Sequence, residues 1–206
     1  MGICDNRVVI ITGAGGGLGA AHAKVFAQQG ASVIVNDINE AAAQLVVAEI
    51  TASGGSAIVN TSDITNYDDS LNAVKQALDT FGDLHVVLNN AGVNRDRMFA
   101  SMTEQEWDTI MAVHLKGHFC ISSHAVHYWR GKAKEGTTID ARIINTTSGA
   151  GLQGSIGQSN YAAAKAGIAA LTLNQAAELA RYGITVNAIA PAARTGMTTS
   201  VPAMAQ

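Results

Sequence analysis

Short apolar, β-branched runs alternate with longer helical patterns along the whole chain, and this alternation constrains the fold more than any other feature. The runs are almost continuously apolar, as in strands buried on both faces of a parallel sheet. The expected strands are Val8 to Thr12, Ser32 to Asn36, Ser56 to Asn60, Val86 to Asn89, Ala141 to Thr146 and Thr185 to Ala190. The expected helices are Leu18 to Gln29, Glu40 to Ser53, Tyr67 to Phe81, Glu104 to Trp129 and Asn160 to Arg181.

This order of elements predicts an α/β fold in which helices cover both faces of a doubly wound parallel sheet, the Rossmann arrangement. No linker or low-complexity segment interrupts the pattern, so we expect a single domain that spans residues 1–206. The length is ample for a sizeable core. The composition, 48% hydrophobic and 14% charged, is that of a compact globular domain.

The charge and the cysteines argue against several classes of function. A net charge of -3, a pI of about 6.0 and the lack of a lysine or arginine cluster argue against a nucleic-acid partner. Cys4 and Cys120 fit no disulfide or metal pattern and point to a reducing compartment. We find no signal peptide and no apolar run long enough for a membrane span, and therefore expect a cytoplasmic protein without a membrane partner.

The turn after the first strand is rich in glycine and reads Thr12-Gly13-Ala14-Gly15-Gly16-Gly17-Leu18-Gly19. Glycines allow a sharp turn and a close approach to a pyrophosphate, while the following helix offers N–H groups to phosphates. Gly13, Gly17 and Gly19 fit G-x-x-x-G-x-G, but a G-x-G-x-x-A pattern also starts at Gly15, so spacing leaves both readings open. No Lys-Ser or Lys-Thr follows, which excludes a P-loop. A flexible turn without a ligand is the alternative.

Asp37 ends the second strand, about twenty residues beyond the glycines, where an acidic residue accepts hydrogen bonds from both hydroxyls of an adenosine ribose. Its carboxylate would repel a 2′-phosphate, and no arginine stands beside it. The sequence therefore favours NAD over NADP. Alternatively, Asp37 caps the next helix, with Glu40 three residues on.

Two further turns are candidates for cofactor contact. Asp63 follows the third strand and is placed to meet the adenine edge, although it could also only cap the helix near Asn66. Asn89-Asn90-Ala91-Gly92 closes the fourth strand with two amides and two small residues, which suits a turn pressed against a cofactor. A plain Asn/Gly turn would look similar.

Ser148, Tyr161 and Lys165 form the strongest catalytic pattern in the chain. Tyr161 lies thirteen residues beyond Ser148, and Lys165 follows four residues later on the same helix face. A lysine ammonium and the positive nicotinamide ring both favour a phenolate, so we expect the pKa of Tyr161 to fall from about 10 toward the working pH. Ser148 would hold the substrate oxygen while Tyr161 takes or returns its proton. An ordinary surface Tyr–Lys pair is the alternative.

Together these residues resemble the short-chain dehydrogenase/reductase family over essentially the whole chain. The resemblance rests on Thr12-Gly13-x-x-x-Gly17-x-Gly19, Asn89-Asn90-Ala91-Gly92, Ser148, Tyr161-x-x-x-Lys165 and Asn187-Ala188-x-Ala190-Pro191. It implies an oxidoreductase that interconverts a secondary alcohol and a ketone with NAD, with Lys165 also on the nicotinamide ribose. The implied cofactor contacts are Gly13, Gly17, Leu18, Gly19, Asp37, Asp63, Ile64, Asn90, Ala91, Gly92, Tyr161, Lys165 and Pro191.

The resemblance also implies an assembly and a continuation of the chain. Family members form homodimers or homotetramers through the two long helices, and the small residues Ala163, Ala164, Gly167 and Ala170 are compatible with such packing. They usually continue with a helical substrate lid and a seventh strand, and both are absent from this sequence. Pro191-Ala192 replaces the family's Pro-Gly, and Thr195 stands one position before its usual threonine.

A histidine stands where the family has its fourth catalytic residue, an asparagine in a Val-Asn-Leu-x-Gly pattern. Here the run is Val113-His114-Leu115-Lys116-Gly117, and we expect His114 to maintain the water relay. The same exchange, together with Asn94-Arg95-Asp96-Arg97 and Ser148-Gly149-Ala150, is similar to the dehydrogenase part of the peroxisomal D-bifunctional protein and its bacterial relatives. That subgroup implies a 3-hydroxyacyl-CoA or a hydroxysteroid as substrate, and thus lipid metabolism.

Several alternatives stay open. An NADP-linked carbonyl reductase is disfavoured by Asp37, and a non-enzymatic Rossmann scaffold is disfavoured by the intact catalytic set. His114 and His118 at i, i+4 could hold a metal, but we expect none and interpret them as part of a half-buried stripe. This stripe also contains Trp107, Ile110, Met111 and Leu115. Arg95 and Arg97 could meet the phosphates of coenzyme A or lie in a solvated loop.

Overall fold

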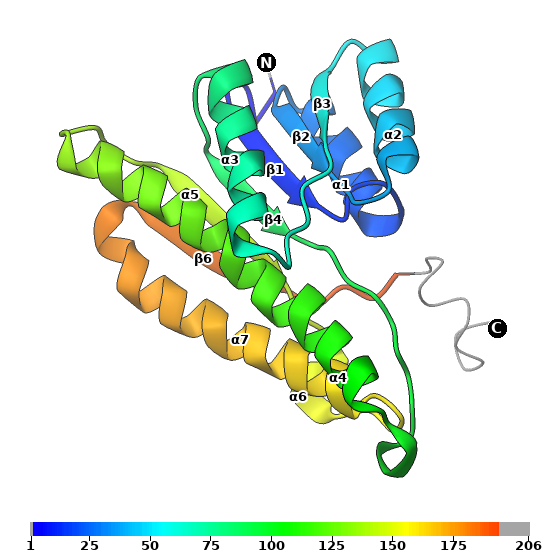
Figure 1. Cartoon of the computed structure of the whole chain (residues 1–206). Coiled ribbons are helices and arrows are strands. Elements are labelled where there is room, and N and C mark those ends of the chain that lie inside the picture. Colours follow the sequence, from blue (N-terminus) through cyan, green and yellow to red (C-terminus); the bar gives the residue numbers. More distant parts are fainter. Residues whose placement is uncertain (1, 194–206) are drawn as a thin grey trace.

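The computed structural model describes residues 2–193 and is built around a parallel sheet of six strands (Figure 1). The strands are β1 (Val8–Thr12), β2 (Ser32–Asn36), β3 (Ser56–Asn60), β4 (Val86–Asn89), β5 (Ala141–Thr146) and β6 (Ile184–Ile189). The predicted bounds hold for β1 to β5, and β6 begins and ends one residue earlier. Their order in the sheet is β3-β2-β1-β4-β5-β6. Because β1 lies beside β4, the chain winds outward from the centre in both directions, which confirms the predicted doubly wound fold.

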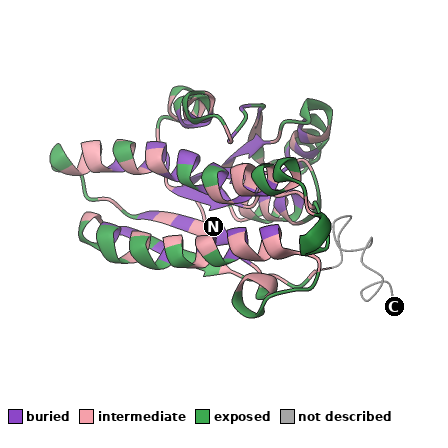
Figure 2. Cartoon of the chain, turned by 60° about the horizontal axis from the view of Figure 1, so that its bottom comes forward, coloured by how far each residue is buried: buried purple, intermediate pink, exposed green. Residues whose placement is uncertain are grey.

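Helices cover both faces of the sheet, and Figure 2 shows the buried residues gathered on the strands and on the inward sides of the helices. One face carries α1 (Gly17–Gln28) and α2 (Glu40–Ala52). The other carries α3 (Tyr67–Phe81), α5 (Gly117–Lys134) and α7 (Ser159–Leu179), which Figure 1 shows together on one side.

Neighbouring side chains of β1 belong to different layers of the core. Ile10 packs into a cluster with α3 and α5, whereas Ile11 packs into a second cluster with α1 and α2. Successive side chains of a strand point to opposite faces of the sheet, and here both faces are covered. A central strand is therefore apolar at every position, as the sequence pattern predicts.

The expectation that every strand is buried on both faces is wrong for β6. Ile184 and Val186 are buried, whereas Thr185 and Asn187 are exposed. β6 lies at the edge of the sheet, and the face that carries Thr185 and Asn187 is open to solvent. Its alternating polarity is the ordinary pattern of a strand that is covered on one side only.

The predicted helix from Glu104 to Trp129 is divided by a π-helical turn. α4 (Glu104–Ile110) starts at a capping box formed by Thr103 and Glu106. The π turn η2 (Met111–Lys116) follows, and α5 then continues to Lys134. Such a turn adds one residue per turn and frequently marks a functional site, and apolar periodicity alone does not reveal it.

η3 (Ala180–Tyr182) forms the end of the predicted helix Asn160 to Arg181, as a 3₁₀ turn after α7. Two short elements are absent from the sequence-based prediction, η1 (Phe99–Ser101) and α6 (Gly149–Gln153). Each is only about one turn long, and α6 is rich in glycine, so neither produces a periodic pattern. Among them, α6 bears on function because it begins directly after Ser148.

Candidate active site

The glycine turn lies at the carboxyl end of β1 and leads directly into α1. Gly13 and Gly17 have φ angles of 63° and 53°, in the left-handed region that favours glycine. A Cβ on Gly19 would lie 2.2 Å from the Gly13 carbonyl oxygen, so packing inside the turn requires a glycine there. A Cβ on Gly16 would meet no atom within 4 Å, and this side of the turn is therefore open. The cradle fits the pyrophosphate of a dinucleotide.

Asn90, from the turn after β4, holds the glycine turn in place. Its side-chain amide donates to the carbonyl oxygens of Thr12 and Gly13 at 3.1 and 3.2 Å. The Thr12 hydroxyl in return accepts the backbone N–H groups of Asn90 and Ala91 at 3.0 and 3.1 Å. The role of Thr12 is not evident from the sequence, where only its place directly before Gly13 marks it.

Asp37 lies at the carboxyl end of β2, facing the glycine turn. Its Oδ2 accepts the N–H of Gly15 at 2.9 Å, and its Oδ1 accepts the N–H of Asn39 at 2.9 Å. The cap of α2 is Asn39, which accepts the N–H of Ala42 at 3.2 Å. The alternative that Asp37 is the helix cap is therefore wrong. The residue is half-buried beside the glycine turn, as a contact with a ribose requires.

Asp63 and Ile64 lie beyond the end of β3. Asp63 is exposed, and its Oδ1 accepts the N–H of Thr65 at 2.8 Å. It does not cap α3, because the cap is Asn66, which accepts the N–H of Asp69. The Ile64 side chain is buried and lies against Gly117, where a Cβ would be 2.7 Å from its Cδ1 atom. Both remain predicted cofactor contacts.

The remaining predicted contacts lie around the same sheet edge. Leu18 is half-buried in the first turn of α1, and Pro191 is half-buried two residues after the end of β6. Gly92 lies against the ring of His114: a Cβ on Gly92 would be 2.4 Å from its Cε1 atom. Thr195 lies outside the described residues.

The structure brings Ser148, Tyr161 and Lys165 together beyond the end of β5. Ser148 is the cap of α6, and its Oγ accepts the N–H of Ala150 at 3.2 Å. Tyr161 lies in the first turn of α7, near enough to Ser148 for the serine hydroxyl to lower its pKa. Lys165 follows one turn later, with Nζ 5.5 Å from the centre of the Tyr161 ring.

Lys165 is the most deeply buried of these three residues, with 2% of its surface exposed. Its Nζ donates to the Thr146 carbonyl oxygen at 2.6 Å. The helix α6 packs against it closely, since a Cβ on Gly151 would lie 2.6 Å from the Lys165 carbonyl carbon. Burial lowers the pKa of Lys165 to about 7, because the ammonium loses its hydration.

The expected fall in the pKa of Tyr161 is not found in the chain by itself. Burial raises that pKa, because a phenolate is poorly solvated there. The hydrogen bond from Ser148 opposes the rise, whereas the charge of Asp96 adds to it. The lower pKa of Tyr161 that the sequence predicts requires positive charge close to the phenolate. The charge that the protein itself supplies does not outweigh the desolvation of the phenolate.

His114 lies in the π turn η2 and is almost completely buried. Its Nε2 lies 2.8 Å from the carbonyl oxygen and 3.1 Å from the backbone nitrogen of Val93, and the tautomer decides which bond forms. Its ring meets that of Tyr161 edge-to-face at 5.2 Å. Burial lowers the pKa of His114 to about 3, so its imidazole is neutral. In residues 2–193, no three potential ligands gather as a metal site.

The two loop arginines differ in their surroundings. Arg97 pairs with Glu106, with Nη2 and Oε1 2.8 Å apart, and Glu106 is the partner of Thr103 in the capping box. The interpretation of Arg97 as a phosphate ligand therefore competes with a structural ion pair. Arg95 is exposed and donates to the Asn94 carbonyl oxygen at 2.7 Å.

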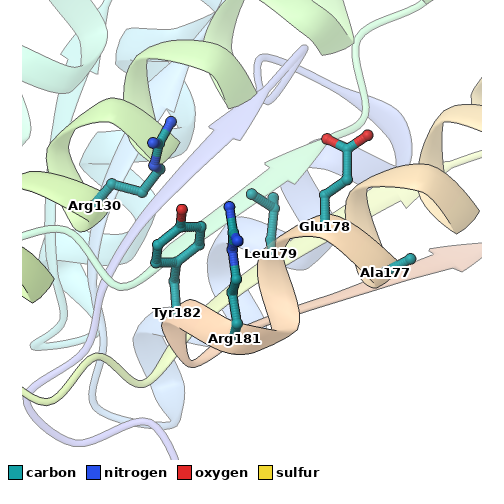
Figure 3. Close-up of a pocket in the computed structure, with 6 residues that line it drawn as sticks. All are labelled: Arg130, Ala177, Glu178, Leu179, Arg181 and Tyr182. Atoms are coloured by element: carbon teal, nitrogen blue, oxygen red, sulfur yellow. The ribbon is translucent and has the colours of Figure 1, made fainter.

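A cavity of about 390 Å³ lies far from this constellation, at the other end of α7 (Figure 3). Arg130 and Arg181 both stack on the ring of Tyr182 there, at 5.1 and 4.8 Å from its centre. Helix rise places Leu179, another lining residue, about 27 Å from Tyr161 along α7. This cavity therefore takes no part in the chemistry at Tyr161.

The lowered pKa of Lys165 has a consequence for stability. The folded chain binds fewer protons than the unfolded chain between the folded pKa of about 7 and the unfolded value of 10.5, so stability rises with pH across that window. We expect Lys165→Met to increase the free energy of unfolding below pH 7 by on the order of 1–4 kcal/mol, because it removes a buried charge. The gain should shrink as the pH rises toward 10.5.

Urea unfolding of the free protein over a pH series measures this effect. Lys134→Met is the matched control, because Lys134 is exposed, and it should change stability little at any pH. A Lys165→Met protein that is less stable than the wild type at every pH would contradict the prediction.

Comparison with known proteins gives consistent matches. Residues 7–206 match the family model described as short chain dehydrogenase. The chain is 48% identical over 186 residues to the hydroxyacyl-CoA dehydrogenase ChsB1 of Mycobacterium tuberculosis, covering 87% of this chain and 58% of that protein. It is 45% identical over 176 residues to the peroxisomal multifunctional enzyme type 2 of Mus musculus, covering 81% of this chain and 23% of that protein.

A solved structure matches almost the whole chain. The crystal structure of a short chain dehydrogenase from Mycobacterium avium has a TM-score of 0.92 and 57% sequence identity, covering 97% of this chain and 72% of that chain. The chain thus spans 58% of the length of the first relative and 23% of the second.

Proposed function

Because the chain belongs to the short-chain dehydrogenase family, as its sequence motifs predict, we propose that it is an NAD-dependent oxidoreductase that interconverts a secondary alcohol and a ketone. The observation that carries this proposal is the meeting of Ser148, Tyr161 and Lys165 at the sheet edge that also holds the glycine turn. A non-enzymatic scaffold has no need of a buried lysine beside a half-buried tyrosine, since burial of the ammonium raises the cost of folding.

The proposed proton path runs through the Tyr161 hydroxyl. Ser148 donates a hydrogen bond to the substrate oxygen, and Tyr161 as a phenolate accepts the proton of the substrate hydroxyl. NAD, when bound, supplies the acceptor for the hydride that leaves the carbinol carbon, so that the alcohol becomes a ketone. The Lys165 ammonium stabilises the phenolate. In the reverse direction Tyr161 returns the proton to the ketone oxygen.

We also propose that His114 replaces the family's asparagine in the water relay. Its ring contacts that of Tyr161, and its Nε2 is engaged with Val93. Its Nδ1 is buried without a hydrogen-bond partner among the described residues, so the hydrogen-bonding capacity of this nitrogen is unused. A neutral imidazole can accept and donate at its two nitrogens, as an amide side chain can.

The preference for NAD rests on Asp37. Its carboxylate lies beside Gly15, where both of its oxygens already accept N–H groups of the surrounding turns. A ribose hydroxyl adds another donor to this carboxylate, whereas a 2′-phosphate adds a second negative charge beside it. None of the salt bridges in the described part of the chain involves Asp37, so its charge is not neutralised.

For the substrate, we propose a 3-hydroxyacyl-CoA before a hydroxysteroid. The name of the M. tuberculosis relative specifies a hydroxyacyl-CoA dehydrogenase, and the mouse relative belongs to the multifunctional type that the His114 pattern resembles. Arg95 remains a candidate for the coenzyme A phosphates, because its guanidinium is exposed near the catalytic helix. The reaction class does not depend on this choice.

The proposed assembly is a homodimer or homotetramer through α5 and α7, which lie side by side (Figure 1). Large apolar side chains are exposed on both helices: Phe119 is 49% exposed on α5 and Leu173 is 73% exposed on α7. Exposed apolar groups of this size are typical of a surface that another subunit covers.

In the described residues, no helix is long and apolar enough to cross a membrane. We propose a cytoplasmic location, although the mouse relative is named as peroxisomal.

The test measures the absorbance of the reduced cofactor while the protein oxidises a 3-hydroxyacyl-CoA with NAD or with NADP. We expect kcat/KM with NAD to exceed that with NADP by about tenfold or more, which corresponds to roughly 1.4 kcal/mol. Asp37→Ser should narrow this ratio, because it removes the negative charge that faces the 2′-position. Asp79→Ser, at an exposed position of α3, is the matched control and should leave the ratio unchanged.

A wild-type protein that prefers NADP would favour the alternative function, that of an NADP-linked carbonyl reductase. Turnover of a hydroxysteroid but of no 3-hydroxyacyl-CoA would reverse the proposed order of substrates. No turnover of either alcohol with either cofactor would reject the proposed function.

A further inference from the structure

A row of three amide side chains runs from β2 across β3 to α3, and the mechanism above does not use it. Asn36 ends β2, Asn60 ends β3, and the two are register partners in the sheet. Asn36 Nδ2 donates to Asn60 Oδ1 at 2.7 Å, and Asn60 Nδ2 donates to the Oε1 of Gln76 on α3 at 2.8 Å. The two asparagines have only 2% and 6% of their surface exposed. We call these three residues the amide row.

Packing of the sheet does not require amides at the ends of β2 and β3. The preceding register pair on the same face is Ile34 with Ile58, and both pack into the apolar core with α3 and α5. Side chains two residues apart on a strand share a face, so an apolar pair in place of Asn36 and Asn60 would continue that core. A buried amide is costly unless its hydrogen bonds are made. The polar pair therefore has a task other than packing.

The amides bind the backbone of the turn that follows β3. The Ser62 N–H donates to Asn60 Oδ1 at 3.1 Å, and the Ser62 carbonyl oxygen accepts Asn36 Nδ2 at 3.0 Å. The next N–H, that of Asp63, donates to the carboxylate of Asp69 on α3 at 2.7 Å. Three successive backbone groups of the turn are thus bound by side chains from β2, β3 and α3. The place of Asp63 beside the sheet depends on these side chains.

Asn60 also binds Asp37, through its main chain. The Asp37 N–H donates to the Asn60 carbonyl oxygen at 3.0 Å. Gln76 fixes the far end of the row, because its Nε2 donates to the Val59 carbonyl oxygen at 2.9 Å while its Oε1 accepts from Asn60. Asn60 therefore connects the carboxylate beside the glycine turn with the turn that is predicted to meet the adenine.

We propose that the amide row positions the adenosine subsite of the cofactor, with Asn60 fixing the turn at Asp63 relative to Asp37. The inference rests on the proposed binding of NAD at these two carboxylates. The asparagines are almost completely buried, so they act through the turn and do not contact the adenosine themselves. A turn that is already fixed loses less entropy when a ligand binds, and the row therefore contributes to cofactor affinity.

Calorimetric titration of the free protein with ADP-ribose, which contains the adenosine and the pyrophosphate but no nicotinamide, tests this inference. We expect Asn60→Leu, which removes all three hydrogen bonds of the side chain, to weaken ADP-ribose binding by about tenfold or more. Gln76→Leu acts only through Asn60 and should weaken binding by about threefold.

Gln175→Leu is the matched control for Gln76→Leu. Gln175 is a half-buried glutamine of α7, and its Oε1 accepts Nδ2 of a buried strand asparagine, Asn145, at 3.1 Å. It therefore has the same kind of contact as Gln76, but on the half of the sheet that is remote from β2 and β3. Gln175→Leu should leave the affinity for ADP-ribose within about twofold of the wild type.

Two further measurements separate positioning from a general loss of stability. In Asn60→Leu the KM for NAD should rise by about tenfold, whereas kcat at saturating NAD stays within about twofold, because the catalytic residues lie on other elements. Hydrogen exchange should become faster at the Ser62 amide, which loses its acceptor, and stay unchanged at the amides of β1, which report global unfolding.

The outcomes separate the inference from the proposed function. A folded Asn60→Leu protein that binds ADP-ribose as tightly as the wild type, or whose Ser62 amide exchanges at the wild-type rate, overturns the inference. A wild type that binds no ADP-ribose also overturns it. If the wild type binds ADP-ribose but oxidises no alcohol, the proposed reaction fails, and the binding and exchange data still decide the role of Asn60. If Asn60→Leu does not fold, Gln76→Leu decides, and an affinity equal to that of Gln175→Leu overturns the inference.

Discussion

Replacement of Tyr161 by phenylalanine is expected to lower kcat by about a thousandfold or more while NAD affinity stays within about twofold. The change removes only the hydroxyl, whose pKa the neighbouring Ser148 lowers. The ring remains, and so does its edge-to-face contact with His114 at 5.2 Å. The loss therefore reports the proton transfer itself and not the packing of α7.

Single-turnover kinetics with NAD and a saturating alcohol measure the effect, and cofactor titration confirms that binding is retained. Tyr128→Phe is the matched control: the Tyr128 hydroxyl donates to Asp83 at 2.7 Å, at a distance from the catalytic residues. That variant should lose about 1 kcal/mol of stability and no turnover. A Tyr161→Phe protein within tenfold of wild type would mean that another group carries the proton.

Replacement of Gly19 by alanine is expected to weaken NAD binding by about 100-fold or more and to lower the free energy of unfolding by about 1–3 kcal/mol. The added Cβ would lie 2.2 Å from the Gly13 carbonyl oxygen and 2.6 Å from Asn90 Nδ2. Neither atom can move freely, because Asn90 donates to Gly13 at 3.2 Å and to Thr12 at 3.1 Å. The whole turn must shift, and the N–H groups that would meet the pyrophosphate shift with it.

Gly16→Ala provides the matched control for this prediction. It adds the same atom three residues earlier, where no neighbour lies within 4 Å and the backbone is extended, with φ of -167°. Calorimetric titration with NAD, together with urea unfolding, should show a large effect for Gly19→Ala and a small one for Gly16→Ala. Equal affinities for the two variants would show that the turn does not bind the cofactor in the proposed way.

The sheet is predictable from the sequence because its central strands are apolar at every position. Ile10 and Ile11 both require an apolar neighbour, and only a sheet with helices on both faces provides one for each. The edge strand β6 departs from this pattern, since Thr185 and Asn187 face solvent. The alternation of apolar and polar residues in β6 is visible in the sequence and indicates a strand covered on one face, whereas the place of β6 at the edge depends on strand order.

The candidate site is predictable where spacing along the chain is sufficient. Tyr161 and Lys165 need only one helical turn to share a face, and Gly13 needs only a strand before it and a helix after it. The role of Thr12 and the π turn around His114 depend on contacts between distant segments. The sign of the pKa shift of Tyr161 depends on the balance of burial against charge, and a sequence does not give that balance.

The hydrogen bonds between Thr12 and Asn90 also set an order of events during synthesis. The two residues are 78 positions apart in the chain, although their strands are neighbours in the sheet. At roughly 5–20 residues per second, a ribosome that has made Thr12 needs about 4–16 seconds to reach Asn90. Throughout that interval the glycine turn lacks the side chain that fixes it. A nascent chain should therefore gain its affinity for nucleotide only when β4 joins β1.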